Sequence, residues 1–373
     1  MKIGIDARFV GPEGTGLGTY TQNLIENLQK IDYKNQYSIF LRASNWQYLK
    51  ITNNNFSKVL ANIAWYSLAE QIKMPAIFTS QNLDLLHVPH FNMPILYKGK
   101  FIVTIHDLIH KHFNQNTTST NNPLIYKLKR AAFAKVLNHA IKGSAKIITP
   151  SKFVKNDIVK NFKVVPSKIT VTYEASEKEY LTDERSTMNN QRYILYVGNA
   201  YPHKNLNKLL DAMKILDTKY LIQNTKLILI CPRDVFARRL TTAIESRNLE
   251  KNVELKDYLP APELKKLFEK ASAYVCPSLS EGFGIPGLNA MASGVPVICS
   301  NIPIFKEVYA DSVHYFDPND EGDIAQKINK VLKDKKLRDN LFKKEKAQVA
   351  KYSWLKMAQE TLKVYEEVLS VTT

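Results

Sequence analysis

The 373-residue sequence has few cysteines and no long apolar run, and both shortages exclude classes of protein. Cys231, Cys276 and Cys299 are too few and too scattered for a disulfide framework or a metal site. Each lies in or beside a short apolar stretch, which is typical of a buried thiol. No uninterrupted apolar run approaches the ~20 residues of a membrane-spanning helix. Asp6 and Arg8 also interrupt the stretch where a signal core would lie, so we expect a cytoplasmic protein.

Acidic residues are scarce relative to basic ones. The chain has 52 Lys and Arg against 35 Asp and Glu, which gives a formal net charge of +17 and a pI near 9.5. This excess favours an anionic partner, which could be nucleic acid, a membrane surface or a phosphorylated small molecule. Between Lys111 and Lys168 twelve basic residues accompany a single acid, Asp157. Because this stretch has no zinc-finger pattern, RNP signature or interleaved aromatics, we expect no nucleic-acid partner.

The segment Pro123–Ile141 is predicted to form a basic amphipathic helix. Its expected apolar stripe consists of Leu124, Leu128, Ala131, Ala132 and Val136. Lys127, Arg130 and Lys135 lie off this stripe. A helix of this kind can rest on anionic lipid headgroups, whereas an ordinary solvated helix face would have the same composition. The sequence leaves both interpretations open.

Short apolar runs alternate with amphipathic helical stretches through the whole chain, a pattern typical of parallel sheets covered by helices. The strands expected in the first part are Lys2–Ile5, Tyr37–Leu41, Leu85–Val88, Phe101–Ile105, Lys146–Thr149 and Ile169–Thr172. Those expected in the second part are Tyr193–Val197, Lys226–Ile230, Val253–Leu255, Ala273–Cys276, Val295–Cys299 and His314–Phe316. The sequence therefore predicts an α/β protein with two doubly wound domains facing a cleft.

The polar segment Glu174–Gln191 has almost no apolar periodicity and is predicted to link the two domains. We expect the first domain to comprise residues 1–175 and the second residues 190–352. The last stretch, residues 353–373, carries Trp354, Met357, Thr361, Val364 and Val368 at helical spacing, which predicts a helix with one buried stripe. In doubly wound sheets ligands bind beyond the carboxyl ends of the strands, so chemistry is expected there.

Three glycine-rich or basic segments follow predicted strands. Gly11, Gly14, Gly16 and Gly18 precede an expected helix, Tyr20–Lys30, but Thr19 stands where a dinucleotide fingerprint needs its third glycine. We therefore reject a Rossmann cofactor site here and expect a flexible loop over a sugar or phosphate.

The two other segments belong to the second part of the chain. Lys204 follows the strand Tyr193–Val197 and precedes a helix, where its charge can neutralise a diphosphate. Glu281, followed by Gly282, Phe283 and Gly284, combines an acid that can accept hydrogen bonds from sugar hydroxyls with backbone N–H groups at a helix start. This last segment is the densest signal in the sequence.

With these motifs in view, the chain resembles the retaining GT-B glycosyltransferases of family 4, also called group 1. The resemblance extends over almost the whole chain and includes bacterial O-antigen and capsule mannosyltransferases. Its motifs are IDAR…GTGLGTYTQNL, HVPHFNMP, VTIHDLIH, ITPSKFVKNDI, VTYEA, YVGNAYPHKNL, PSLSEGFGIPGLNAMASGVPVI and SWLKMAQETLKVYEEVL. It implies two Rossmann-like domains, with the C-terminal helix crossing back onto the first, so that residues 353–373 join residues 1–175 in the acceptor-side domain and residues 190–352 bind the nucleotide sugar.

The resemblance also implies roles for individual residues. Glu281 would contact hydroxyls of the donor sugar, the Gly282–Gly284 amides would bind its periphery, and Lys204 would neutralise the diphosphate leaving group. Gly16 and Gly18 would close over the donor, and His106 would lie beside the anomeric carbon and help to place the acceptor. The residues implied on the acceptor side are His90, Asn92, His106 and Asp107. No metal or other cofactor is implied, and the sequence contains no Asp-x-Asp motif.

Two positions depart from the family pattern. Members commonly have a second Glu eight positions after the first, which grips the nucleotide ribose, and here that position is Asn289. Asn lacks the anionic acceptor that binds two vicinal hydroxyls strongly. The common phosphate-binding Arg after the strand glycine is Asn199 here, and Arg233 is the candidate that replaces its charge.

We therefore expect an enzyme that transfers a hexose, with mannose from GDP-mannose preferred, to a lipid-linked glycan or polysaccharide. A UDP-sugar transferase of the same fold is the alternative. An alternative of another class is a nucleotide-sugar-binding protein with little or no turnover, suggested by Asn199 and Asn289. The basic first domain predicts a peripheral position at an anionic membrane surface.

Overall fold

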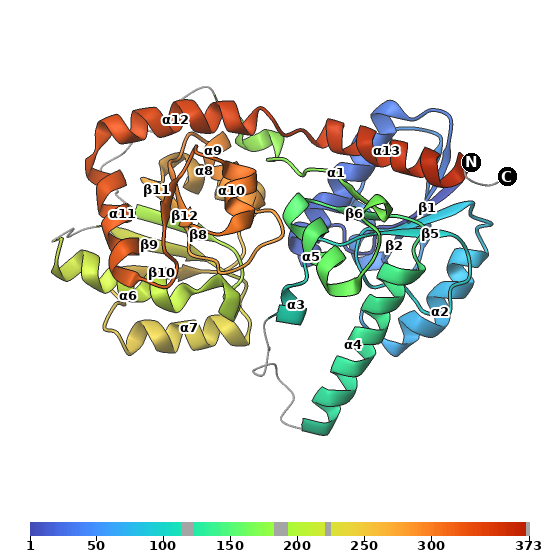
Figure 1. The fold of residues 1–373 in the computed structure, drawn as a ribbon, viewed down its shortest axis with the longest axis horizontal. Coiled ribbons are helices and arrows are strands. Elements are labelled where there is room, and N and C mark those ends of the chain that lie inside the picture. The colour runs from blue at the N-terminus through green and yellow to red at the C-terminus, as the bar shows by residue number, and fades with distance from the viewer. Residues whose placement is uncertain (113–122, 183–192, 221–224, 371–373) are drawn as a thin grey trace. The chain divides into compact units, whose positions relative to one another are not determined.

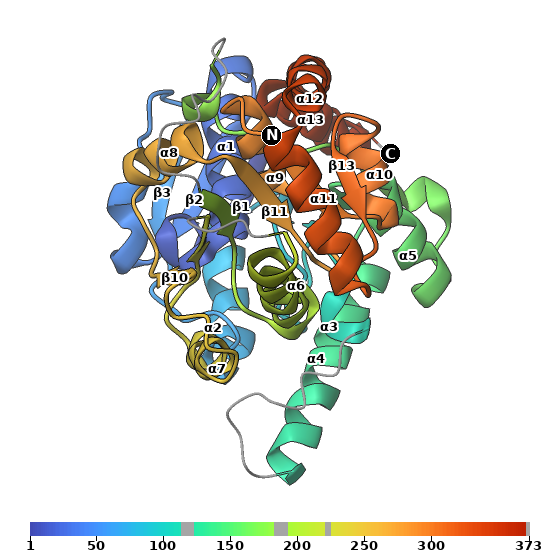
Figure 2. The ribbon, with the colours of Figure 1, turned by 90° about the vertical axis from the view of Figure 1, so that its left-hand side faces the viewer.

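The computed structural model describes residues 1–112, 123–182, 193–220 and 225–370. The chain forms two compact units. Unit 1 comprises Met1–Leu108, Thr120–Glu174 and Ser353–Thr373, and unit 2 comprises Ile109–Ser119 and Ala175–Tyr352. Each unit contains a parallel sheet with helices on both faces (Figures 1 and 2). The doubly wound architecture expected from the sequence is thus confirmed.

Unit 1 is built on a seven-stranded sheet in the order β3-β2-β1-β4-β5-β6-β7. Its strands are β1 (Lys2–Asp6), β2 (Gln36–Leu41), β3 (Phe56–Leu60), β4 (Leu85–Val88), β5 (Phe101–Thr104), β6 (Ile147–Thr149) and β7 (Ile169–Val171). Its helices are α1 (Thr15–Ile31), α2 (Leu68–Thr79), α4 (Pro123–Gly143), α5 (Lys152–Phe162) and α13 (Trp354–Ser370). The strands read as nearly continuous apolar runs because helices cover both faces.

Unit 2 is built on a six-stranded sheet in the order β10-β9-β8-β11-β12-β13. Its strands are β8 (Tyr193–Val197), β9 (Lys226–Ile230), β10 (Val253–Lys256), β11 (Ala273–Cys276), β12 (Val297–Ser300) and β13 (His314–Phe316). Its helices are α3 (Ile109–His112), α6 (Leu206–Thr218), α7 (Val235–Glu245), α8 (Ala261–Lys270), α9 (Ile285–Ala292), α10 (Pro303–Tyr309), α11 (Glu321–Lys333) and α12 (Lys335–Val349). In both sheets the order in which the chain adds strands reverses at the centre of the sheet. In doubly wound folds ligands bind at this point, beyond the carboxyl ends of the strands.

The three cysteines are buried thiols, as the apolar runs around them predict. Cys276 and Cys299 are register partners on β11 and β12. Burial raises the pKa of Cys276 to about 11 and that of Cys231 to about 12, so both side chains remain neutral thiols at physiological pH.

The C-terminal helix α13 packs on α1 within unit 1, as the predicted stripe requires. Trp354, Met357, Thr361, Val364 and Val368 are all buried. A hydrogen-bond chain reinforces this packing, because the hydroxyl of Tyr365 lies 2.7 Å from His87 Nδ1. His87 Nε2 in turn lies 2.8 Å from Thr104 Oγ1, at the end of β5. The last helix is therefore an integral part of unit 1.

The apolar stripe predicted for α4 is wrong at its centre. Ala131 and Ala132 are exposed, and the buried side of the helix carries Leu137, Ala140 and Ile141 instead. Two alanines bury too little apolar area to decide which face packs, whereas the larger Leu137 and Ile141 do. The side chains of Leu124, Lys127 and Leu128 lie outside the described residues.

The segment expected to be a polar linker is packed over its described part, residues 174–182. Glu174 is buried, and Tyr180 is only 2 % exposed because its ring meets Phe268 edge-on at 5.3 Å. The Thr182 N–H donates to Ala292 O at the end of α9 (3.0 Å). Residues 183–192 lie outside the described residues.

None of the described helices combines the length and the apolar character that crossing a bilayer requires.

Candidate functional site

The loop between β11 and α9 is the motif that the sequence marks most strongly, and its backbone requires glycine. Gly284 precedes α9 with φ +104°, in the left-handed region. A Cβ atom there would lie 2.3 Å from the hydroxyl oxygen of Tyr309, which donates a 2.5 Å hydrogen bond to Gly284 O. Any side chain at this position would break that bond. Glycine at this position therefore allows α9 to begin directly after the loop that carries Glu281.

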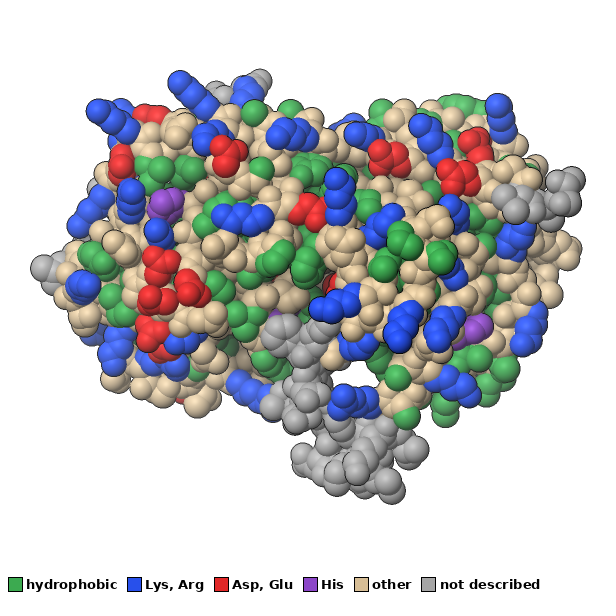
Figure 3. Space-filling view, viewed as in Figure 1, with side chains coloured by type: hydrophobic (Ala, Val, Ile, Leu, Met, Phe, Trp, Pro, Cys, Tyr) green, Lys and Arg blue, Asp and Glu red, His purple; other side chains and the backbone are tan. Residues whose placement is uncertain are grey.

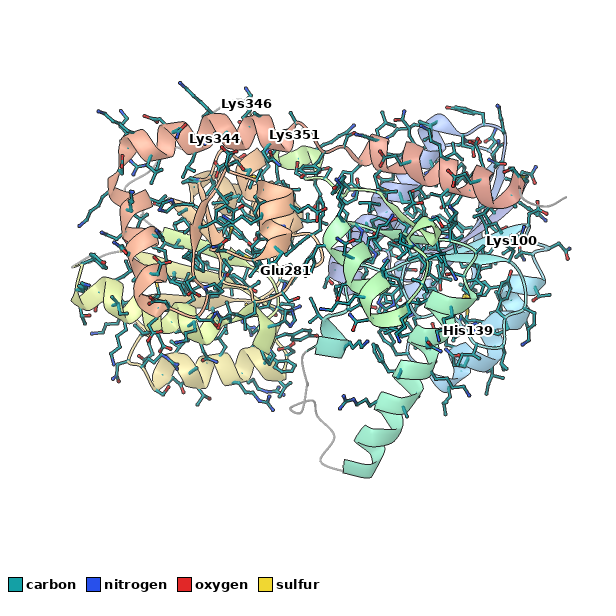
Figure 4. All side chains as sticks on the ribbon, in the orientation of Figure 1. Lys100, His139, Glu281, Lys344, Lys346 and Lys351 are labelled. Atoms are coloured by element: carbon teal, nitrogen blue, oxygen red, sulfur yellow. The ribbon has the colours of Figure 1, made fainter. Side chains whose placement is uncertain are left out.

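Glu281 and Lys204 form an ion pair in unit 2. Lys204 Nζ donates to Glu281 Oε1 at 2.6 Å, and Ser278 Oγ donates to the same oxygen at 2.6 Å. Both charged side chains are largely buried, with 15 % and 14 % exposure for Lys204 and Glu281. Burial alone would raise the pKa of the Glu281 carboxyl, but the charge of Lys204 and the two hydrogen bonds hold it below its usual value. Figure 4 labels Glu281 in its place on the β11–α9 loop.

Two loops are fastened together to make this pair. The Leu279 N–H donates to His203 O at 2.7 Å, which joins the loop after β11 to the loop after β8. Asn205 takes a left-handed conformation (φ 58°), and its side-chain amide donates to Pro277 O at 3.2 Å and to Pro318 O at 2.8 Å. Lys204 therefore reaches Glu281 from a backbone that is fixed on both sides.

Asn199, which stands where the resembled family has an arginine, and Arg233, the candidate to replace that charge, both lie on unit 2. Asn199 caps the turn after β8, where its Oδ1 accepts a 3.3 Å hydrogen bond from the Tyr201 N–H. Arg233 follows β9, the neighbouring strand, and its side chain is 78 % exposed and paired with Asp257 at 3.4 Å. Phe283 is only 3 % exposed, so its ring belongs to the core.

In unit 1 His106 follows β5 and is held by hydrogen bonds at both ring nitrogens. Nδ1 lies 3.0 Å from Glu174 Oε1, and Nε2 lies 3.1 Å from Pro89 O. Tyr20 meets the ring edge-on at 4.7 Å. Since the carbonyl oxygen of Pro89 can only accept, Nε2 is the hydrogen-bond donor of that contact.

The other residues implied on the acceptor side are buried to different degrees. His90 is 6 % exposed and lies among aromatic rings, with Phe91 at 3.9 Å and Phe9 at 5.2 Å. Asn92 is 4 % exposed and donates to the Glu70 carboxylate. Asp107, next to His106, is half-buried. Asn92 thus belongs to an internal network rather than to an open surface.

That network contains a fully buried arginine. Arg8 donates to Asp6 Oδ2 and to Glu70 Oε1, each at 2.6 Å, and all three side chains are at most 1 % exposed. The Glu70 carboxylate also accepts a 2.8 Å hydrogen bond from the Tyr66 N–H. The network ties together the segments that follow β1, β3 and β4, at the edge of the sheet where a ligand is expected.

The glycine-rich segment after β1 differs from the expected loop. Helix α1 begins at Thr15, so Gly16 and Gly18 lie in its first turns, and the predicted start at Tyr20 is wrong. A Cβ on Gly18 would lie 2.6 Å from Gly11 O and 2.7 Å from Phe9 O, whereas one on Gly16 would meet open space. The absent side chain at Gly18 lets the preceding turn fold against the helix, which is why the helix starts early despite its glycines.

Comparison with known proteins places this geometry in a family. The model of glycosyl transferases group 1 matches residues 179–348, and that of Glycosyltransferase Family 4 matches residues 14–175. The chain belongs to the group 1 glycosyltransferases. It is 28 % identical over 335 residues to the O-antigen chain mannosyltransferase RfbU of Salmonella typhimurium, covering 86 % of this chain and 88 % of that protein.

Solved structures agree on the GT-B fold of this glycosyltransferase. Sucrose-phosphate synthase from Thermosynechococcus elongatus superposes with a TM-score of 0.80 at 17 % identity, covering all of both chains. Anabaena HepE, solved with UDP and glucose, superposes with a TM-score of 0.74 at 14 % identity, covering 98 % of this chain and all of that one.

The structure of the glycosyltransferase also brings forward residues that the sequence analysis did not single out. Ser278 hydrogen-bonds Glu281, Glu174 hydrogen-bonds His106, and Glu177 hydrogen-bonds Asn289. Both acids lie in the segment that was expected to be a linker. A signal for Glu174 existed in the sequence, because it follows a predicted strand within the motif VTYEA. For Glu177 the sequence gives no comparable signal.

Proposed function

We propose that this glycosyltransferase transfers a hexose from a nucleoside-diphosphate sugar to a lipid-linked glycan or polysaccharide, with mannose from GDP-mannose as the first candidate. The Lys204–Glu281 pair carries the proposal. It joins a cation suited to a diphosphate with a carboxylate suited to sugar hydroxyls, on the loop that precedes the N-terminus of α9. The similarity to an O-antigen chain mannosyltransferase supports the choice of sugar and acceptor class.

In this proposal the hexosyl group moves from a phosphate oxygen of the donor to an oxygen of the acceptor. The bond between the anomeric carbon and the phosphate oxygen breaks, and the bond to the acceptor oxygen forms. The acceptor oxygen attacks on the face from which the diphosphate leaves and gives its proton to that diphosphate, so the anomeric configuration is retained. Lys204 stabilises the charge that develops on the leaving group, and Glu281 holds the sugar through its hydroxyls. Donors at the Gly282–Gly284 backbone contribute to this binding, and no metal takes part.

A UDP-sugar is the second candidate donor. The observation that favours it is the similarity of fold to HepE, a protein solved with UDP and glucose.

The remaining binding groups are the same for either donor. On the donor side they are Gly16, Gly18, Asn199, Arg233 and Asn289, and on the acceptor side they are His90, His106 and Asp107. Asn92 is left out of this set because its side chain is only 4 % exposed and donates to Glu70 within unit 1.

Calorimetric titration with GDP, UDP, ADP and their sugars, followed by transfer assays with and without EDTA, tests the proposal. One nucleoside diphosphate should bind, and transfer should survive EDTA. Lys204→Met and Glu281→Gln should each lower kcat about 100- to 1000-fold, the range found when one group that stabilises a transition state is removed. Lys208→Met is the matched control, because Lys208 pairs with Glu321 at 2.5 Å on the exposed side of α6.

Removing one partner of the buried pair can destabilise unit 2. The double variant Lys204→Met/Glu281→Gln leaves no unpaired charge and should stay folded while remaining inactive. Near-normal transfer by a folded variant would show that the site is placed wrongly. Diphosphate binding without transfer to any acceptor would instead support the binding protein without turnover.

We further propose that unit 1 rests on an anionic membrane surface that carries the acceptor. Arg130 and Lys135 are exposed on α4. The α4–α5 hollow, about 570 Å³ in volume, contains three lysines and no acid; it is lined by Ala134, Lys135, Asn138, Lys142, Asn161, Phe162 and Lys163. Figure 3 shows further basic side chains on the visible face of each unit. Lipid phosphates are partners of matching charge.

A further inference from the structure

Glu177 and Asn289 hold each other by a reciprocal pair of hydrogen bonds in unit 2. The Glu177 N–H donates to Asn289 Oδ1 at 3.2 Å, and Asn289 Nδ2 donates to Glu177 Oε1 at 3.4 Å. The Thr182 N–H donates to Ala292 O, so residues 177–182 follow α9 in the direction of the helix. Glu177 therefore lies nearer than Thr182 to the N-terminus of α9, where the Glu281 loop ends.

The carboxylate of Glu177 is in an unfavourable electrostatic environment. Burial raises its pKa, and the negative charge of Glu179 raises it further, whereas the hydrogen bond from Asn289 opposes both. Within the part of the chain that the structure describes, no lysine or arginine forms an ion pair with it. A half-buried carboxylate without a counter-charge is costly to keep ionised, and groups of this kind gather at binding sites.

Holding the segment in place does not require this carboxylate. The backbone N–H of Glu177 already ties the segment to Asn289, Thr182 ties it to the end of α9, and Tyr180 packs against Phe268. The carboxylate accepts a single long hydrogen bond from Asn289, although an ionised carboxylate has about four acceptor sites. Most of its capacity to accept hydrogen bonds is thus available to a ligand.

The position of the carboxylate matches a nucleotide bound at the proposed donor site. Asn289 lies five residues after Gly284, which corresponds to about 7 Å along the helix axis. This separation is comparable to that between the ribose and the terminal phosphate of a nucleoside diphosphate. A phosphate at the start of α9 would bring the two vicinal ribose hydroxyls to the level of Asn289 and Glu177, and carboxylates bind such hydroxyls strongly.

We propose that Glu177, oriented by Asn289, binds the ribose hydroxyls of the donor nucleotide. The inference rests on the proposed function. Glu177 supplies from a neighbouring segment the negative charge that the amide of Asn289 lacks. Asn289 has the complementary task, because its amide fixes one carboxylate oxygen and leaves the second to the ligand.

Isothermal titration with the nucleoside diphosphate that binds the wild type, and with its 2′-deoxy and 2′,3′-dideoxy forms, tests the inference. We expect the wild type to bind the ribonucleotide about 10- to 100-fold more tightly than the dideoxy form, as hydrogen bonds to a charged group allow. Glu177→Gln should lose most of this discrimination while binding the dideoxy form as well as the wild type does. Glu179→Gln, which alters an exposed neighbouring acid, is the matched control and should retain discrimination.

A charge swap makes the test independent of simple loss of function. Asn289→Glu alone places two carboxylates side by side and should weaken binding, whereas Glu177→Gln/Asn289→Glu returns one carboxylate to the pair and should restore the preference for ribose. Thermal unfolding of Glu177→Gln should match that of the wild type, because the hydrogen bond from the backbone N–H of residue 177 to Asn289 Oδ1 remains. Unchanged ribose discrimination in folded Glu177→Gln would overturn the inference. A wild type that binds no nucleoside diphosphate would overturn the proposed function itself.

Discussion

Replacing Glu70 by glutamine should lower the free energy of unfolding of unit 1 by about 3 kcal/mol. The side chains of Glu70 and Arg8 are fully buried, and their charged atoms lie 2.6 Å apart. Breaking a buried ion pair by removing one partner costs about 3–5 kcal/mol, and we take the lower end because Asp6 still pairs with Arg8. In glutamine one of the two carboxylate oxygens becomes an N–H₂ group, which faces either the donor of Arg8 or those of Tyr66 and Asn92. Because two donors cannot hydrogen-bond to each other, at least one hydrogen bond is lost.

The corresponding change in melting temperature is large enough to measure easily. In a unit of this size each kcal/mol shifts Tm by about 2–4 °C, so the unit 1 transition should fall by about 6–12 °C. Differential scanning calorimetry can separate this transition from that of unit 2. Glu13→Gln is the matched control, because Glu13 pairs with Arg42 at 3.3 Å on the surface, where it is 66 % exposed. That variant should lose less than about 1 kcal/mol. Equal losses in both variants would refute the reasoning.

Two further predictions concern unit 1. Burial, together with the nearby His106, lowers the pKa of His87 to about 3, so the unfolded chain takes up a proton below about pH 6.5 that the folded chain does not. The free energy of unfolding should therefore fall as the pH drops from 6.5 towards 3, by up to about 1.4 kcal/mol per pH unit. Urea titrations at pH 7 and pH 5 measure this change, which should be smaller in His87→Asn than in the wild type. For the membrane proposal, Arg130→Gln/Lys135→Gln should bind anionic vesicles about 30-fold more weakly in sedimentation, since each basic residue near the surface contributes about 1 kcal/mol. The control Lys343→Gln/Lys346→Gln, on α12, should lose less affinity for the vesicles than the α4 variant loses. Equal sedimentation of the wild type and the α4 variant would show that α4 is not part of the membrane interface.

The strands of both sheets could be predicted from the sequence, with one exception. Strands covered on both faces read as short apolar runs, and every one of those runs became a strand. The exception, β3, lies at the edge of the unit 1 sheet, where only Phe56 of its residues is buried. An edge strand that packs on one side carries polar residues such as Ser57 and Lys58 and resembles a loop in the sequence.

The candidate site could be predicted residue by residue, but its contacts could not. Lys204 and Glu281 were both expected at the carboxyl ends of strands, yet their ion pair depends on the register of two loops that lie 77 residues apart in the chain. Glu174 and Glu177 were missed because polarity alone marked their segment as a linker. Burial of a charged residue is a tertiary property, because it depends on partners such as His106 and Asn289 that come from other elements.

The attachment of α13 to unit 1 has a consequence for synthesis of the chain on the ribosome. Unit 2 lies almost entirely within Ala175–Tyr352, so it can form its sheet as soon as that stretch has emerged. Unit 1 precedes unit 2 in the chain but lacks Trp354, Met357 and Tyr365 until the residues that follow unit 2 have emerged. The part of the protein that is made first is therefore completed only after unit 2, and until α13 emerges the face of α1 that packs against it stays uncovered.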